Sequence, residues 1–99
     1  MRAVLLLQCA DRSGIVAAVG TFVADAGGNV VEADQHSDPS AGLFLQRVEF
    51  DVDAPLTSLR EMFAPVAERF AMEWSLRDLA VWSRPATSAP QAAQISRWT

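Results

Sequence analysis

The sequence predicts an α+β fold of the ferredoxin-like type, in which two helices cover one face of a four-stranded antiparallel sheet. The 99 residues suffice for one domain with a modest core, and 51% of them are hydrophobic. The apolar positions follow strand and helix spacing in the order strand, helix, strand, strand, helix, strand. With right-handed crossovers, two strand–helix–strand units of this kind form such a sandwich.

A strand, a helix and a hairpin are predicted in the first half of the chain. Residues 3–9 are almost continuously apolar, which is typical of a central strand. The helix that follows is expected to end at a left-handed glycine stop at residues 27–28. Residues 29–37 are extended, and a turn at residues 38–42 leads into a strand at residues 43–50. The expected inward residues are Ile15, Val16, Val19, Phe22, Val23 and Ala26 of the helix, and Phe44, Val48 and Phe50 of the strand at residues 43–50.

A second helix and a final strand are predicted after the polar segment at residues 51–55. Thr57 or Ser58 can cap this helix, and Ser58 with Glu61 fits a capping box. Pro65 is expected to kink or restart the helix, because proline lacks a backbone donor. The expected apolar stripe is Leu59, Met62, Phe63, Val66 and Phe70, after which Met72, Trp74 and Leu76 alternate with Glu73, Ser75 and Arg77 as in a half-buried strand.

The composition changes near the end of the chain. Residues 83–93 are rich in Ser, Ala, Pro and Gln and lack periodicity, so we expect a domain at residues 1–82 and a tail or linker at residues 83–99. Two strands carry apolar residues on both faces. The sheet face without helices is therefore expected to bind another copy, another domain or the tail.

Charge and cysteine content exclude several classes of function. The net charge is −4, so the chain lacks the basic stripe that nucleic acids require. The single Cys9 cannot form an internal disulfide, and no segment is long enough to span a membrane, which together predict a cytoplasmic protein. Asp34, His36 and Asp38 could share one side of a strand, but a single His makes a poor metal site. We expect neither a metal nor a cofactor.

A short polar turn at residues 11–14 joins the first strand to the first helix. It brings a carboxylate, side-chain donors and a glycine to a helix N-terminus, where free N–H groups favour an anion such as an amino-acid carboxylate. The alternative is that Asp11 and Ser13 only cap the helix, and that Asn29 only follows a glycine turn. The same residue types serve both purposes.

Four segments resemble a known family: residues 11–19 (DRSGIVAAV), 29–38 (NVVEADQHSD), 47–50 (RVEF) and 63–70 (FAPVAERF). They are similar to the ACT domain, an amino-acid-sensing module of metabolic enzymes, and in particular to the N-terminal domain of formyltetrahydrofolate deformylases. The resemblance covers residues 3–78 and departs at Ala10 and Ser13, where the family usually has proline. Residues 79–99 do not resemble the catalytic domain that follows in the family and carries its catalytic Asn, His and Asp. No catalytic residue is therefore expected in this chain.

The resemblance also implies a binding site shared between two copies of the chain. In ACT domains the amino acid lies between the first turn of one subunit and the start of the second strand of its neighbour. Asp11 is then expected to bind the ammonium group, and the Gly14 and Ile15 amides the carboxylate. An edge position of the second strand predicts a homodimer, with a higher oligomer possible through the open sheet face. The residues expected at the site are Asp11, Arg12, Ser13, Gly14 and Ile15 of one copy, with Asn29, Val30 and Val31 of the other, the two valines near the twofold axis.

Three functions are compatible with this resemblance. The first is a stand-alone regulatory module that binds a small amino acid, of the glycine or methionine class, in one-carbon and purine metabolism. The second is the N-terminal fragment of a formyltetrahydrofolate deformylase, which converts formyltetrahydrofolate and water into formate and tetrahydrofolate only with its catalytic domain. The third is an interaction protein that pairs with full-length relatives and has lost ligand binding.

Overall fold

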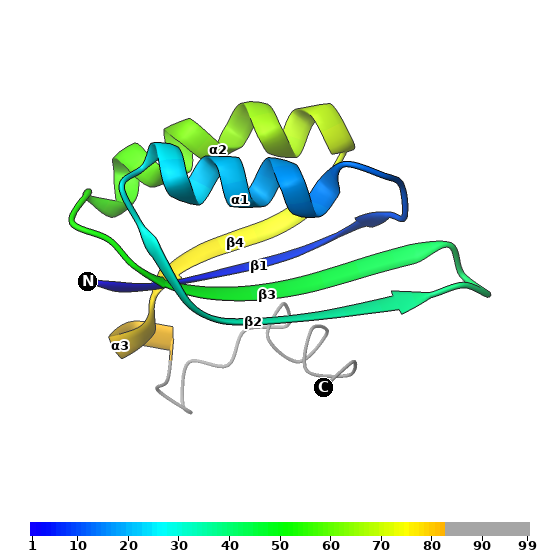
Figure 1. Ribbon diagram of the computed structural model, residues 1–99, viewed down its shortest axis with the longest axis horizontal. Coiled ribbons are helices and arrows are strands. Elements are labelled where there is room, and N and C mark those ends of the chain that lie inside the picture. Colours follow the sequence, from blue (N-terminus) through cyan, green and yellow to red (C-terminus); the bar gives the residue numbers. More distant parts are fainter. Residues whose placement is uncertain (83–99) are drawn as a thin grey trace.

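The first strand of the chain lies inside the sheet and pairs with a neighbouring strand on each side. In the computed structural model, which describes residues 1–82, the strand order is β2-β3-β1-β4 and all pairs are antiparallel. Helices α1 and α2 cover one face of this sheet (Figure 1), which confirms the predicted ferredoxin-like fold. The elements are β1 (Arg2–Ala10), α1 (Ile15–Asp25), β2 (Asn29–Asp38), β3 (Leu43–Asp51), α2 (Leu56–Phe70), β4 (Glu73–Asp78) and α3 (Leu79–Trp82).

The core lies between the sheet and the two long helices. Phe22 of α1 connects the layers, because its ring centre lies 6.0 Å from that of Phe50 in β3 and 4.9 Å from that of Phe63 in α2. Both contacts are edge-to-face, a favourable geometry for aromatic rings. The alternate residues Ala3, Leu5, Leu7 and Cys9 of β1 face this core and are buried.

The buried face of helix α1 contains fewer residues than the apolar spacing predicts. Val16 is 48% exposed, so the buried residues of α1 are only Ile15, Val19, Phe22 and Val23. The predicted glycine stop is confirmed at Gly27, which has φ 74° and donates to the Ala24 carbonyl. Gly28 has a different role: a Cβ there would lie 3.1 Å from side-chain atoms of Phe50 and Val23.

Helix α2 begins earlier than the capping signals indicate. Pro55 is its N-cap residue, and no side chain caps it. The predicted cap at Thr57 or Ser58 and the Ser58–Glu61 capping box are therefore wrong, because Leu56 already begins the helix and both residues lie in its first turn. The helix also continues through Pro65 without restarting. Met62 is 38% exposed, and Ala67 takes its place among the buried residues.

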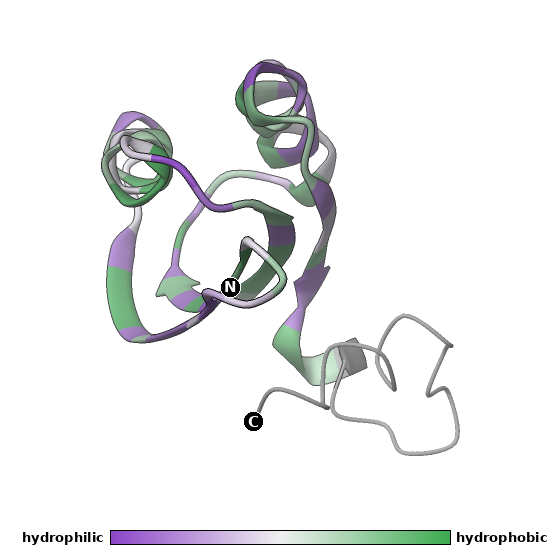
Figure 2. Ribbon diagram, turned by 90° about the vertical axis from the view of Figure 1, so that its right-hand side faces the viewer, coloured by the Kyte–Doolittle hydropathy of each residue, from purple (hydrophilic) through white to green (hydrophobic). Residues whose placement is uncertain are grey.

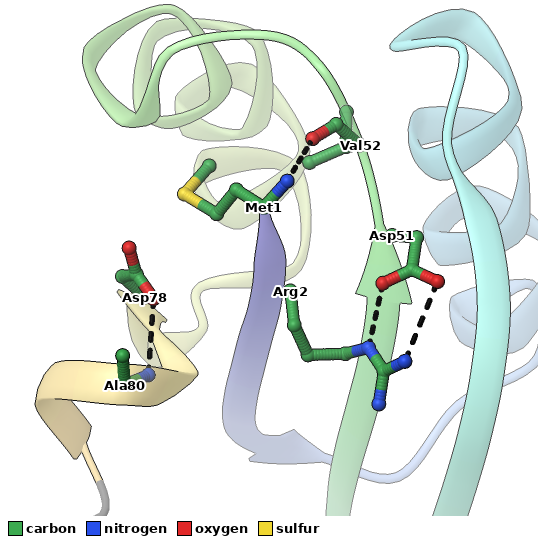
Figure 3. A network of polar contacts seen from close by, with 6 residues as sticks. All are labelled: Met1, Arg2, Asp51, Val52, Asp78 and Ala80. Carbon is green, nitrogen blue, oxygen red and sulfur yellow. Dashed lines mark hydrogen bonds and ion pairs between the residues drawn. The ribbon is translucent and has the colours of Figure 1, made fainter.

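The end of the described chain turns to the other side of the sheet. The short helix α3, which the sequence pattern did not predict, lies on the face opposite α1 and α2 (Figure 2). Asp78 accepts a hydrogen bond from the Ala80 N–H at 3.0 Å and so fixes the start of α3 (Figure 3). The predicted tail at residues 83–99 lies outside the described residues.

The sheet face without the long helices carries both apolar and charged side chains. Val4, Leu6 and Leu45 on this face are at most 6% exposed. Charged residues occupy much of the remainder, including Arg47, which contacts Glu49 at 2.9 Å. In the described part of the chain, no helix is long and apolar enough to cross a membrane.

Candidate functional site

The polar turn at residues 11–14 is held in place by the end of the hairpin. The Asp11 N–H donates to the Gly42 carbonyl at 2.9 Å, which continues the β1–β3 pairing into the turn. Gly14 has φ 94°, a left-handed conformation that costs little only for glycine. The chain then enters α1 directly, and the Gly14 carbonyl accepts the first helical hydrogen bond, from the Ala18 N–H.

The turn leaves its polar groups unused by its own helix. No side chain caps α1, so the alternative in which Asp11 and Ser13 only cap the helix is wrong. Both residues are exposed. The first N–H groups of α1, from Ile15 onward, precede the first intrahelical bond and lack an acceptor within the helix. A carboxylate is therefore favoured electrostatically at this helix end.

Two arginines, one in the turn and one at the end of α2, lie over the same aromatic ring. The Arg12 guanidinium carbon lies 5.0 Å from the centre of the Phe70 ring, and so does that of Arg69 at the end of α2. Phe70 is 3% exposed, so its ring is a fixed platform for both cations. Arg69 and Phe70 were not predicted at the site. The helical spacing of apolar residues predicted Phe70 only as a core residue, and no sequence motif connected α2 with the turn.

The second half of the predicted site lies at the start of β2. Asn29 opens this edge strand opposite Asp51, and it is exposed. The β2–β3 register shifts between Val30 and Glu32, which leaves Val31 as the extra residue of a bulge. Val30 and Val31 are each 46% exposed. Two exposed valines on an unpaired strand edge are a surface suited to another strand.

The two halves lie at opposite ends of the sheet within one chain. The turn adjoins Gly42, whereas Asn29 pairs with Asp51, nine residues further along the hairpin. This spacing corresponds to about 30 Å along an extended strand. Figure 1 shows the turn and the start of β2 at opposite ends of α1. A single chain therefore cannot bring Asn29 to its own turn.

Other candidate groups have structural roles. Asp38 accepts hydrogen bonds from the Ser40 hydroxyl and N–H, and the hydroxyl bond in particular lowers the pKa of Asp38. Within residues 1–82 no three His, Cys, Asp or Glu side chains form a group that could hold a metal ion. Cys9 is 4% exposed, and burial raises the pKa of its thiol, which disfavours a nucleophilic role.

The chain matches solved and curated proteins over most of its own length. It is 45% identical to the formyltetrahydrofolate deformylase of Bacillus subtilis over 76 residues, which are 73% of this chain and 25% of that protein. The deformylase structure from Pseudomonas syringae superposes with a TM-score of 0.76 at 42% identity, covering 81% of this chain and 28% of that one. An ACT domain protein from Streptococcus pneumoniae shares the fold, with a TM-score of 0.73 at 23% identity and coverage of 85% and 96%.

These matches are confined to one region of the relatives. The chain spans only 25% of the Bacillus subtilis deformylase and 28% of the Pseudomonas syringae structure, and the matched part is their ACT-containing N-terminal region. The family model of the ACT domain matches residues 3–63 of the chain. Together with the strand order and the position of the turn at the N-terminus of α1, this match shows that the chain belongs to the ACT domain family.

Proposed function

We propose that this ACT domain binds a small amino acid, of the glycine or methionine class, between two copies of the chain. The observation that carries this proposal is the separation of the turn at residues 11–14 from Asn29 within one protomer. Each half offers exposed polar groups that its own protomer leaves unused at that end of the sheet. A twofold dimer brings the turn of one copy to Asn29 of the other, and it does so twice.

The ligand's carboxylate is bound at the N-terminus of α1. The Gly14 and Ile15 amides donate to it, and the positive end of the helix dipole adds to this attraction. Arg12, held over the Phe70 ring, supplies positive charge at the same place. Asp11 binds the ammonium group, Ser13 offers a hydroxyl, and Asn29 of the partner copy donates and accepts hydrogen bonds.

The proposed dimer forms through β2 and the adjacent face of α1. Strand β2 is an edge strand whose residues are nearly all exposed. The other edge strand, β4, is partly obstructed, because the Arg60 guanidinium donates to the Leu76 carbonyl at 2.9 Å. The exposed positions at the start of α1, Val16 and Ala17, carry no charge, so a second copy can approach closely there. Because about 30 Å separates Asn29 from the turn within one copy, the twofold axis of this dimer passes midway between them and away from Val30 and Val31.

The metabolic setting is proposed from the relatives. A regulatory role in one-carbon and purine metabolism follows from similarity to deformylases, and a cytoplasmic location suits an unpaired Cys9. The second candidate is a larger deformylase that contains this region, which the identity of 45% to the Bacillus subtilis protein favours. In that case the amino acid regulates hydrolysis of formyltetrahydrofolate. The reading frame that follows residue 99 in the gene distinguishes the two candidates.

A thermal screen of the twenty amino acids tests the proposed binding. A ligand that binds only the folded dimer, at about 100 times its dissociation constant, stabilises the fold by roughly 2.7 kcal/mol. For a domain of this size the melting temperature then rises by several degrees. If no amino acid raises it while the protein remains dimeric, the interaction-only function replaces ligand binding.

A further inference from the structure

The outer edge of β4 carries backbone groups that point away from the sheet. Just before β1, Met1 and Val52 exchange both of their backbone hydrogen bonds at 3.0 Å (Figure 3 shows one of them). The backbone N–H and C=O groups of the odd-numbered residues of β1 therefore point toward β3. The backbone groups of the even-numbered residues of β1 therefore point toward β4, where Leu6 pairs with Ser75. The intervening Leu76 must then direct both its N–H and its carbonyl outward.

Arg60 confirms this orientation. It reaches from α2 to the Leu76 carbonyl, donating from Nη2 at 2.9 Å and from Nε at 3.3 Å. These bonds fix one guanidinium beside the outward N–H of Leu76. A positively charged group and an outward-pointing backbone donor thus lie together at the β4 edge.

A shallow hollow of about 230 Å³ lies at this edge, and none of the described residues that line it is acidic. It contains two of the eight basic residues of a chain whose net charge is −4. Arg77 is half-buried there and has no ion-pair or hydrogen-bond partner among residues 1–82. The lining residues are Arg60, Trp74, Ser75, Leu76 and Arg77.

Ser75 supplies the second observation that points to a ligand. It is 8% exposed, and its buried Oγ has no hydrogen-bond partner within the described chain. A buried hydroxyl without a partner is unfavourable, and a bound ion or water is among the explanations for such a group in a native protein. This hydroxyl belongs to the same hollow as the two guanidinium groups.

The other arginines of the described chain are already engaged. Arg2 binds Asp51 at 2.6 Å, Arg47 binds Glu49, and Arg12 and Arg69 lie over Phe70. Only the hollow at β4 combines an unpaired guanidinium with a second cation, an outward N–H and an unpartnered hydroxyl, within residues 1–82.

We propose that this hollow binds a small oxyanion, a carboxylate or a phosphate. Arg77 and Arg60 bind the oxygens of the anion through their guanidinium groups. The Leu76 N–H, at the strand edge, and the Ser75 hydroxyl, in the hollow, each donate a hydrogen bond to the anion. The site lies on the edge of the sheet opposite β2. It therefore goes beyond the proposed amino-acid site and does not depend on it.

Titration of the full chain followed by NMR tests the proposal. Sodium phosphate and sodium acetate are added separately at constant ionic strength, and the backbone amides and the arginine Nε–H groups are observed. We expect saturable shifts at Ser75, Leu76 and Arg77 and at the Arg60 Nε–H with at least one anion. The anion that saturates identifies a phosphate or a carboxylate ligand. Absence of saturation with both anions overturns the proposal.

Two variants separate this site from general attraction of anions. Arg77→Gln and Ser75→Ala should each weaken binding roughly tenfold, since hydrogen bonds to charged groups are strong. Arg2→Gln removes an arginine that is paired elsewhere and should leave the affinity unchanged. The amide spectrum shows that each variant is folded. Equal binding by wild type and both site variants contradicts the proposal, whereas Asn29→Ala should affect only the amino-acid site.

Discussion

The Arg12 guanidinium lies over the ring of Phe70, with 5.0 Å between its carbon and the ring centre. This contact joins the turn before α1 to the last residue of α2, fifty-eight positions later in the chain. A flexible arginine at the candidate site is thereby positioned by a ring that is itself 3% exposed. The core thus orients a charged group at the site.

Phe70→Leu should weaken binding of the amino acid although it leaves Arg12 in place. The change conserves most of the apolar volume and should cost less than about 1.5 kcal/mol of unfolding free energy. It removes the aromatic face that positions the cation. Phe63→Leu, an equivalent change of a core residue that Arg12 does not contact, is the matched control. Calorimetric titration should show weaker binding only for Phe70→Leu, and equal affinities would refute the role of the ring.

Gly14→Ala should destabilise the fold because of its backbone and not because of crowding. A Cβ at this position meets only a Phe70 ring atom at 4.0 Å, but φ is 94°. We expect a loss of about 1–2 kcal/mol in urea unfolding. Gly20→Ala is the control: this glycine lies in α1 without close neighbours, and the change should stabilise by about 0.5–1 kcal/mol. Two changes of the same sign would contradict this explanation.

Acid should weaken the fold partly through Asp51. The hydrogen bond from Arg2 lowers the pKa of this carboxyl in the folded chain. Its contribution is therefore complete above the ordinary pKa of about 4 and is lost as the pH falls through the lowered folded value. Asp51→Asn should flatten the dependence of the urea midpoint on pH in this acidic range. Asp53→Asn, which removes an exposed carboxylate without a partner among residues 1–82, should leave the dependence unchanged.

Cys9 should react slowly with iodoacetamide in the folded protein. It is buried in β1, and burial raises the pKa of its thiol, so little thiolate is present at neutral pH. Unfolding in urea should restore the ordinary rate of alkylation, measured by mass spectrometry. Rapid modification of the native protein would show that β1 opens or that the thiol is accessible.

Local patterns were sufficient to predict the sheet and both long helices, because strand and helix periodicity report which side of each element is buried. They failed where the backbone begins a helix without a side-chain cap, as at Pro55, and where a proline is accommodated inside one, as at Pro65. The turn was found because Asp11 and Gly14 are local signals. The contact between distant elements that places Arg12 over Phe70, where Arg69 also lies, required the tertiary structure.

The most direct measurement of the central claim mixes two variants that each lose the amino acid. Asp11→Ala removes the turn's carboxylate and Asn29→Ala removes the partner's amide, so neither protein alone should bind the amino acid found in the screen. In a mixed dimer one site carries both changes and the other carries neither, so about one quarter of all sites should be restored after exchange. Calorimetry that detects this fraction supports a site shared between copies. A mixture that binds no better than either variant alone contradicts it.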